Sequence, residues 1–344
     1  MRIAYSCAGE GFGHAARMIA LVPDLTDNHR VYLFVPPTVK TFVKTRLPRV
    51  PVLEIPCFTL TKRGNRIDYS RTLFNALRMA LILRPTVRRL AQQLRMLHVD
   101  IVLSDFDPLL PWAARVAKIP IVQMNHPGIV QKYVSYEPQS WITSLLARYL
   151  EGPWDKRIHV SFFGGDVGPV LRKGLYRHII RDDGFLAVNL KEDARAKILP
   201  ILDSIPGLKY RLYPAPQADF DEGLATCSAV ITGAGHQTLS EALCMGKPVL
   251  SIPQEGQFEQ LLNARMLERS GRGTFCTVQT LPKELPRFLA HLDAYRIPRV
   301  LPRDFYVRDS RTRLLFLLNR YFETLTHHTV PEYEINDTPE RMAL

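Results

Sequence analysis

Residues 229–264 read AVITGAGHQTLSEALCMGKPVLSIPQEGQFEQLLNA, and this stretch decides the fold that we expect. A β-branched run ends at Gly233 and Gly235, an apolar helical pattern follows, and Gly246 closes that helix before a second buried strand. Two glycines at a strand end let the backbone approach a ligand closely. Because the first N–H groups of a helix carry the positive end of its dipole, the stretch predicts an anion site suited to a phosphate.

One turn into the predicted helix, Glu241 offers a second ligand group. Its carboxylate can accept hydrogen bonds from two neighbouring hydroxyls, as a ribose diol would present them. The alternative is that the two glycines form only a tight turn and that Glu241 is a solvated helix residue.

Taken together, AGHQTLSEALCMGKPVLSIP and the later EQLLNA resemble the donor-binding motif of the GT-B glycosyltransferases, the superfamily of MurG and of the UDP-glucuronosyl and plant UDP-sugar transferases. The resemblance implies that the glycine turn and helix start bind a nucleotide diphosphate, the helix glutamate the ribose, and an acidic-Gln pair the sugar. The loop before that pair differs by two residues from the usual Pro-x-x-x-Asp-Gln spacing. These roles would fall on Gly233, Gly235, His236, Gln237 and Thr238 for the diphosphate, on Glu241 for the ribose, and on Glu259 and Gln260 for the sugar.

A second glycine loop, Gly9-Glu10-Gly11-Phe12-Gly13-His14, follows a predicted strand over 3–7 and precedes a helix expected over 15–25. Its spacing differs from the Gly-x-Gly-x-x-Gly of nicotinamide enzymes, and no acidic residue ends the next strand, 31–35, so a nicotinamide site lacks its ribose ligand. The loop does place a histidine at a helix start. The helix dipole disfavours the imidazolium there, so the ring stays neutral and able to accept a proton.

This loop also resembles the glycine-histidine loops that open GT-B transferases, with Arg17 where proline is frequent. The resemblance implies that His14 is the general base on an acceptor hydroxyl and that Gly11 and Gly13 lie on the acceptor side. A helix cap or a packed histidine is the alternative for His14.

Asp105 and His126 follow the ends of two later strands, expected over 99–103 and 119–124 with a helix over 111–118 between them. In a parallel sheet, ligands gather at the carboxyl ends of the strands, so Asp105 should lie near His14. Resemblance to the plant UDP-sugar transferases implies that Asp105 orients His14 and stabilises it once protonated. The alternatives are a capping aspartate at Asp105 and, for His126, a plain turn in place of a position facing the acceptor.

The predicted fold class is α/β, with two Rossmann-like domains facing each other across a cleft, as in GT-B enzymes. Glycine and proline pairs after residue 150 suit an interdomain linker. The expected parts are an acceptor-binding domain over 1–150, a linker over 151–183, a donor-binding domain over 184–326 whose last helix, 304–325, crosses back by resemblance, and a polar, acidic tail over 327–344.

Composition indicates the compartment. The five cysteines are odd in number and form no Cys-x-x-Cys pair, which favours buried thiols in a reducing environment over disulfides or a zinc site. The apolar run at the start is too short for a signal peptide, and no stretch approaches the ~20 apolar residues of a spanning helix. We expect a cytoplasmic protein.

Positive charge is concentrated in the first part of the chain: residues 1–150 carry 20 Lys and Arg against 9 Asp and Glu, out of a net charge of +12 for the whole. Lys62–Arg95 alone holds nine basic residues and one acid, and its apolar spacing predicts a helix over 69–83 and a second one beginning at Pro85. We expect this segment to bind an anionic membrane surface on which a lipid-linked acceptor would lie. A solvated basic surface is the alternative.

The function that we predict is inverting, metal-independent transfer of a sugar from a nucleotide diphosphate sugar, expected to be a UDP-sugar, to an acceptor hydroxyl. No cofactor and no metal is expected, because backbone amides and a helix dipole can stabilise the leaving diphosphate. Two alternatives remain: a nucleotide-sugar epimerase or hydrolase of the same fold, and a non-enzymatic module that binds a membrane or nucleic acid. His14, Asp105 and Glu241 argue against the second, so we do not expect nucleic acid as a partner.

Overall fold

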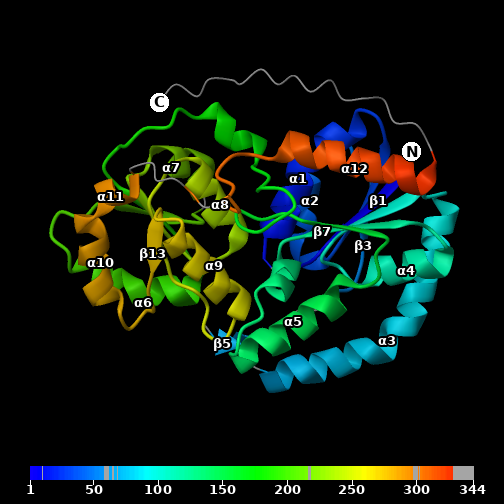
Figure 1. Ribbon diagram of the computed structural model, residues 1–344, viewed down its shortest axis with the longest axis horizontal. Coiled ribbons are helices and arrows are strands. Elements are labelled where there is room, and N and C mark those ends of the chain that lie inside the picture. The colour runs from blue at the N-terminus through cyan, green and yellow to red at the C-terminus, as the bar shows by residue number, and fades with distance from the viewer. Residues whose placement is uncertain are drawn as a thin grey trace.

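The computed structural model describes residues 1–9, 11–57, 62, 63, 66, 67, 69–215, 218–296, 301 and 303–327, with only the backbone for the described residues between 62 and 82. Two units lie beside each other, each built on a parallel sheet flanked by helices (Figure 1). The predicted α/β class with two Rossmann-like domains is therefore confirmed.

The first sheet has six parallel strands in the order β3-β2-β1-β6-β7-β8. Parallel strands are covered by helices on both faces, which explains runs such as IAYSC and VYLFV, where nearly every residue is buried. The strands are β1 Arg2–Cys7, β2 Arg30–Val35, β3 Val52–Glu54, β6 Ile101–Asp105, β7 Ile121–Asn125 and β8 Lys156–His159; Lys62–Arg63 and Arg66–Ile67 form a separate antiparallel pair, β4 and β5.

The second sheet has five parallel strands in the order β10-β9-β11-β12-β13. Its core is formed by the buried side chains of these strands together with those of the helices packed on its two faces. The strands are β9 Leu186–Asn189, β10 Tyr210–Tyr213, β11 Ala229–Thr232, β12 Val249–Ser251 and β13 Gly273–Phe275.

Helices connect the strands on both sides of each sheet (Figure 1). Those of the first unit are α1 Gly13–Thr26, α2 Pro37–Arg46, α3 Tyr69–Met96, α4 Leu109–Ala117, the 3-10 turn η1 Pro127–Lys132 and α5 Pro138–Glu151. Those that follow are the 3-10 turn η2 Lys173–Arg177, α6 Glu192–Asp203, α7 Phe220–Thr226, α8 His236–Cys244, α9 Phe258–Arg269, α10 Leu281–Ala290, α11 Leu292–Arg296 and α12 Arg311–Thr326.

Each sheet reverses its strand order at one point, and these points position the site. In the first sheet the reversal lies between β1 and β6, whose last residues, Cys7 and Asp105, are register partners. In the second it lies between β9 and β11, where Asn189 pairs with Thr232. Ligands of open α/β sheets bind in the crevice outside the strand ends at such a reversal.

The last helix, α12, belongs to the first unit although it follows the second in the chain. Its buried residues Leu314, Leu318 and Phe322 lie in the same apolar cluster as Ile3 of β1. Figure 1 shows α12 beside α1, on the unit that holds the N-terminus. The chain therefore crosses between the two units twice.

Two predicted boundaries are wrong. The range 151–183, expected to be a linker, contains β8, because the edge of the first sheet accepts a sixth strand that pairs along β7. The helix expected to restart at Pro85 is instead the single helix α3, which runs through that proline. A proline removes one helical hydrogen bond and bends a helix, but the packing of Leu90, Ala91 and Leu94 against the first sheet holds the second half in place.

Within the described part of the chain, no helix is long and apolar enough to span a membrane.

Candidate active site

His14 and Asp105 meet at the strand reversal of the first sheet. His14 is the second residue of α1, and Asp105 is the last residue of β6. The His14 Nδ1 atom lies 2.7 Å from Asp105 Oδ1, and Asp105 is fully buried while the histidine side chain keeps 13% of its surface exposed. When Nδ1 donates its proton to this carboxylate, the lone pair of the ring lies on Nε2, which is the arrangement that a general base needs.

Arg17, which sequence analysis noted only as a departure from proline, completes the contact. Its Nη1 atom donates to Oδ1 and Oδ2 of Asp105 at 3.0 and 2.9 Å, and the residue is 2% exposed. A buried carboxylate needs a paired cation to remain charged, and Arg17 supplies it. The signal available in the sequence was the spacing of Arg17 three residues after His14, which places both on one face of α1.

Phe106 covers the ring of His14. The two rings lie nearly parallel, 6.1 Å apart between centroids with an angle of 7°. Phe106 has φ +62°, a rare backbone conformation for a bulky residue, and its N–H donates to Gln123 Oε1 at 3.2 Å. Strain of this kind persists only where the surroundings impose it, and here it turns the ring toward the histidine.

The start of α8 faces the start of α1. A Cβ placed on Gly13 would lie 3.5 Å from Cβ of Gln237, so the first turns of the two helices are adjacent. Beside Gly235 nothing lies within 4 Å of such a Cβ, and beside Gly233 the nearest atom is 3.9 Å away. The N-cap residue of α8 is Gly235, which has no side chain to cap the first turn. The amides of His236, Gln237 and Thr238 thus begin a helix next to open space, as an anion site requires. Gly11, in the loop before α1, takes φ +79°, which glycine adopts without strain.

Glu241 is more enclosed than the sequence suggested. Its carboxylate is 1% exposed and accepts from Arg172 Nε and Nη2 at 2.7 and 2.8 Å, and from Gln237 Nε2 at 2.9 Å. Arg172, which sequence analysis missed, lies in the chain between β8 and β9 and also pairs with Asp221 at 2.6 Å. A ribose hydroxyl would therefore share this carboxylate with a guanidinium.

Glu259 and Gln260 lie in the first turn of α9. Gln260 is bound within its own loop, since it donates to Gln257 Oε1 and accepts from the N–H of Gln254, both at 2.9 Å. The Glu259 carboxylate is partly exposed and lies 3.8 Å from Nε2 of His126.

His126 and His236 join the two units. Their rings stack 3.8 Å apart between centroids at 19°. His126 Nε2 lies 2.9 Å from Asn263 Oδ1 on α9, while His236 Nε2 accepts from the N–H of Phe162 at 3.2 Å. We expected His126 to face the acceptor, but its ring is 1% exposed and packs between the units. The His236 ring is enclosed too.

Burial decides the charge of these two histidines. It lowers the pKa of His126 to about 3 and that of His236 well below its ordinary value, and the nearby positive charge of Arg17 acts in the same direction. Both rings are therefore neutral at physiological pH.

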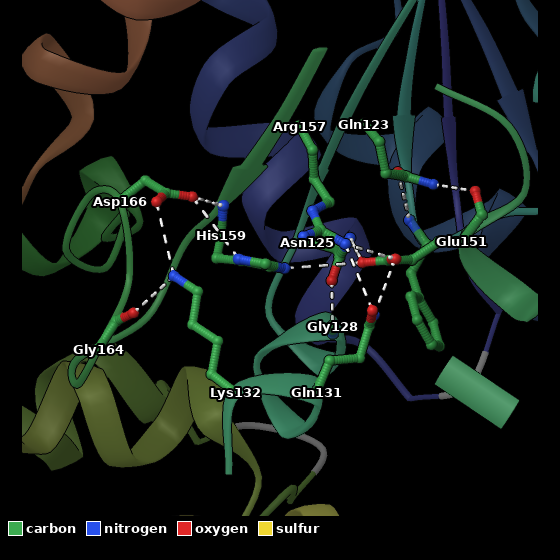
Figure 2. Close-up of polar contacts among 11 residues, drawn as sticks. Gln123, Asn125, Gly128, Gln131, Lys132, Glu151, Arg157, His159, Gly164 and Asp166 are labelled. Atoms are coloured by element: carbon green, nitrogen blue, oxygen red, sulfur yellow. Dashed lines mark hydrogen bonds and ion pairs between the residues drawn. The ribbon is translucent and has the colours of Figure 1, made fainter. Parts of the chain in front are cut away.

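Figure 2 shows how the turn that carries His126 is anchored. The buried Glu151 carboxylate accepts from Asn125 Nδ2 at 3.0 Å and from Gln131 Nε2 at 2.9 Å, while Arg157 approaches at 3.3 Å. Burial by itself would raise the pKa of Glu151, but its interactions with His159 and these partners outweigh that effect and lower it. The N–H of Gly128 completes the anchor by donating to Asn125 Oδ1 at 2.7 Å.

Among the residues that the structure describes, no three side chains of the metal-binding types gather into a group that could hold a metal ion.

Comparison with known proteins identifies the class. The fold matches the spinosyn rhamnosyltransferase SpnG, with a TM-score of 0.60 at 13% identity over 93% of this chain and 100% of that one. It also matches MurG of Acinetobacter baumannii, with a TM-score of 0.58 at 14% identity over 95% and 99%. The protein therefore has the GT-B fold, and the resemblance first noticed in residues 229–264 is confirmed.

The chain belongs to glycosyl transferase family 1, whose members it matches over residues 1–150 and 206–293. An uncharacterized glycosyltransferase of Methanosarcina acetivorans is 25% identical over 351 residues, or 86% of this chain and 92% of its own. A second one, from Methanosarcina mazei, is 24% identical over 338 residues, or 82% and 87%. The predicted enzyme class, a glycosyltransferase, is confirmed.

Proposed function

We propose that this glycosyltransferase moves a sugar from a nucleoside diphosphate sugar to an acceptor hydroxyl in one inverting step. The observation that carries the proposal is the hydrogen bond of His14 to Asp105, located where the first turn of α1 meets that of α8. One solved GT-B structure, that of SpnG, contains thymidine diphosphate, which supports a nucleotide donor. We propose a UDP-sugar as the donor, with a dTDP-sugar as the competing alternative.

In this mechanism His14 Nε2 takes the proton of the acceptor hydroxyl while its oxygen attacks the anomeric carbon. The bond between that carbon and the diphosphate oxygen breaks, and its electron pair leaves with the nucleoside diphosphate. Asp105 stabilises the imidazolium that forms. The amides of His236, Gln237 and Thr238 stabilise the charge on the leaving group, so we propose that no metal and no cofactor is required.

A donor panel followed by two variants tests this proposal. UDP, dTDP, GDP and their sugars are screened by thermal shift, because a ligand that binds only the folded state raises Tm. His14→Ala should then lower turnover by about 10²–10⁴-fold and leave donor affinity nearly unchanged, since the base acts on the acceptor. A His14→Ala enzyme with normal kcat would refute the role of His14.

The stereochemistry and the rival activities are tested in the same system. NMR of the product should show the opposite anomeric configuration to the donor, and retention would refute the single step. Incubation with donor alone distinguishes the alternatives, because an epimerase would yield a new nucleotide sugar without any acceptor and a hydrolase would release the free sugar as its main product.

We further propose that the acceptor is lipid-linked and that the enzyme works on the inner, anionic face of the cell membrane. A stripe of exposed apolar side chains on α5 supports this. Their spacing places them on one helical face, and the single exposed charge of α5 is Arg148, since Glu151 is buried. Aromatic and basic residues without acids suit an anionic bilayer surface. The stripe consists of Trp141, Ile142, Leu145, Leu146 and Tyr149.

The basic segment Lys62–Arg95 was expected to make this contact. Its first part lies outside the described side chains, but Arg84, Arg88 and Arg89 of α3 are exposed. Each basic residue near an anionic surface contributes about 1 kcal/mol, so several must act together.

Sedimentation with liposomes tests the membrane proposal. Wild type should pellet with anionic vesicles, less so at high salt, while Trp141→Ser with Leu145→Ser should stay in solution. Ile179→Ser, which removes an exposed apolar side chain outside α5, is the matched control and should behave as wild type. Wild type that ignores anionic vesicles at low salt would refute the proposal, and a change of oligomeric state on substitution would assign the stripe to a second copy of the chain.

A further inference from the structure

Arg17 has no role in the mechanism proposed above, yet its guanidinium contacts both carboxylate oxygens of Asp105. Both Arg17 and His14 project from one face of α1, one turn apart. Both bond to the same oxygen, Asp105 Oδ1, at 3.0 and 2.7 Å. The guanidinium nitrogen and the histidine Nδ1 therefore lie within about 6 Å of each other, a range in which charges shift each other's pKa.

The arrangement differs from a simple histidine-carboxylate pair because the carboxylate serves two cations. An unshared Asp105 would place a full negative charge beside the ring and favour the imidazolium. With Arg17 bonded to both of its oxygens, that charge is already balanced before His14 takes a proton. The carboxylate can then fix the tautomer and orientation of the ring through its contact with Nδ1.

The other ionisable groups around the pair do not replace Arg17. Burial raises the pKa of Tyr5 and of Cys7, so both remain uncharged. His126 and His236 are neutral for the same reason, burial. Asp107 bonds away from the site, to the N–H groups of Leu109 and Leu110, and burial raises its pKa to about 6. Arg17 is thus the fixed charge that balances Asp105.

We infer that Arg17 is a positioning residue of the general base: it locks Asp105 in place and offsets the negative charge that this carboxylate presents to His14. The inference rests on the proposed function only in treating His14 as the base. The electrostatic part is a property of the free protein and can be measured without substrate.

Titration of the His14 imidazole by NMR tests this inference, with the His14→Ala spectrum used to assign the signal. Arg17→Gln keeps a hydrogen-bond donor and removes the charge, so the pKa of His14 should rise by about one to three pH units. Arg17→Lys keeps the charge and is the matched control, with a pKa near that of wild type. A purely structural Arg17 would leave the titration of His14 unchanged in folded Arg17→Gln protein, and that result would overturn the inference.

If Arg17→Gln does not fold, Arg17→Met decides, because it also removes the charge and keeps a long side chain: a rise of one pH unit or more in the His14 midpoint supports the inference, and a smaller change or none overturns it. Kinetics give a second measure. The acid limb of the kcat/KM profile should move to higher pH in Arg17→Gln by the same amount as the NMR midpoint. If the NMR midpoint moves and the acid limb does not, the charge balance is correct and His14 is not the base.

Discussion

Lowering the pH from 7.5 to 5.0 should destabilise the protein by protonating its unfolded state at the positions of two buried histidines. The pKa of His126 is lowered by burial to about 3 in the folded chain, while an unfolded histidine titrates near 6.5. Below pH 6.5 the His126 side chain therefore binds a proton in the unfolded state but not in the folded state. Stability from this group is fully present above pH 6.5 and is lost as the pH falls toward the folded pKa.

The size of the effect follows from the two pKa values. Each pH unit between them changes the free energy of unfolding by about 1.4 kcal/mol, so His126 alone should cost about 2 kcal/mol at pH 5.0 relative to pH 7.5. His236 shifts in the same direction and adds to the loss. The effect is concentrated where the two units meet, because the two rings stack on each other there.

Urea unfolding at both pH values measures this loss, and His126→Gln isolates it. The variant has no group to protonate at this position, so its stability should fall by about 2 kcal/mol less than that of wild type over the same pH interval. His98→Asn, which replaces an exposed histidine, is the control and should follow wild type. Equal pH dependence in wild type and His126→Gln would refute the reasoning.

Three other predictions concern buried charges and the site. Arg172→Ala should destabilise the protein by about 3–5 kcal/mol, because it leaves the Glu241 carboxylate buried without its cation, and the double variant with Glu241→Gln should recover part of that loss in urea unfolding. Glu151→Gln should lower the free energy of unfolding by about 2 kcal/mol at pH 7 in the same assay. The difference between variant and wild type should shrink as the pH falls through the lowered pKa of Glu151, because the wild-type carboxylate is then protonated and has lost its charge as well. Chelation with EDTA should leave the transfer rate unchanged, and a rate restored by added Mg²⁺ would contradict metal independence.

Much of the fold could be predicted from local patterns. Buried β-branched runs, glycine loops and helical spacing indicated strands β1, β2, β6 and β7 of the first sheet, strands β11 and β12 of the second, the helix at residues 236–244 and the glycine turn before it. These features depend on residues close together in the chain, so a window of a few residues carries the information. The same locality explains the two errors, because β8 depends on its pairing with β7 and the continuity of α3 on packing of the helix, neither of which a local window contains.

In the candidate site, too, local sequence determines some features and the tertiary structure determines the others. The sequence alone determined that His14 begins a helix, that Asp105 ends a strand, and that a glycine turn precedes α8. Only the tertiary structure decided what these groups contact: Arg17 lies 88 residues from Asp105, and Arg172 lies 69 from Glu241. A buried charge has no water to stabilise it, so it needs a counterion nearby. Which residue supplies that counterion depends on how the two units pack, because the partners are far apart in the sequence.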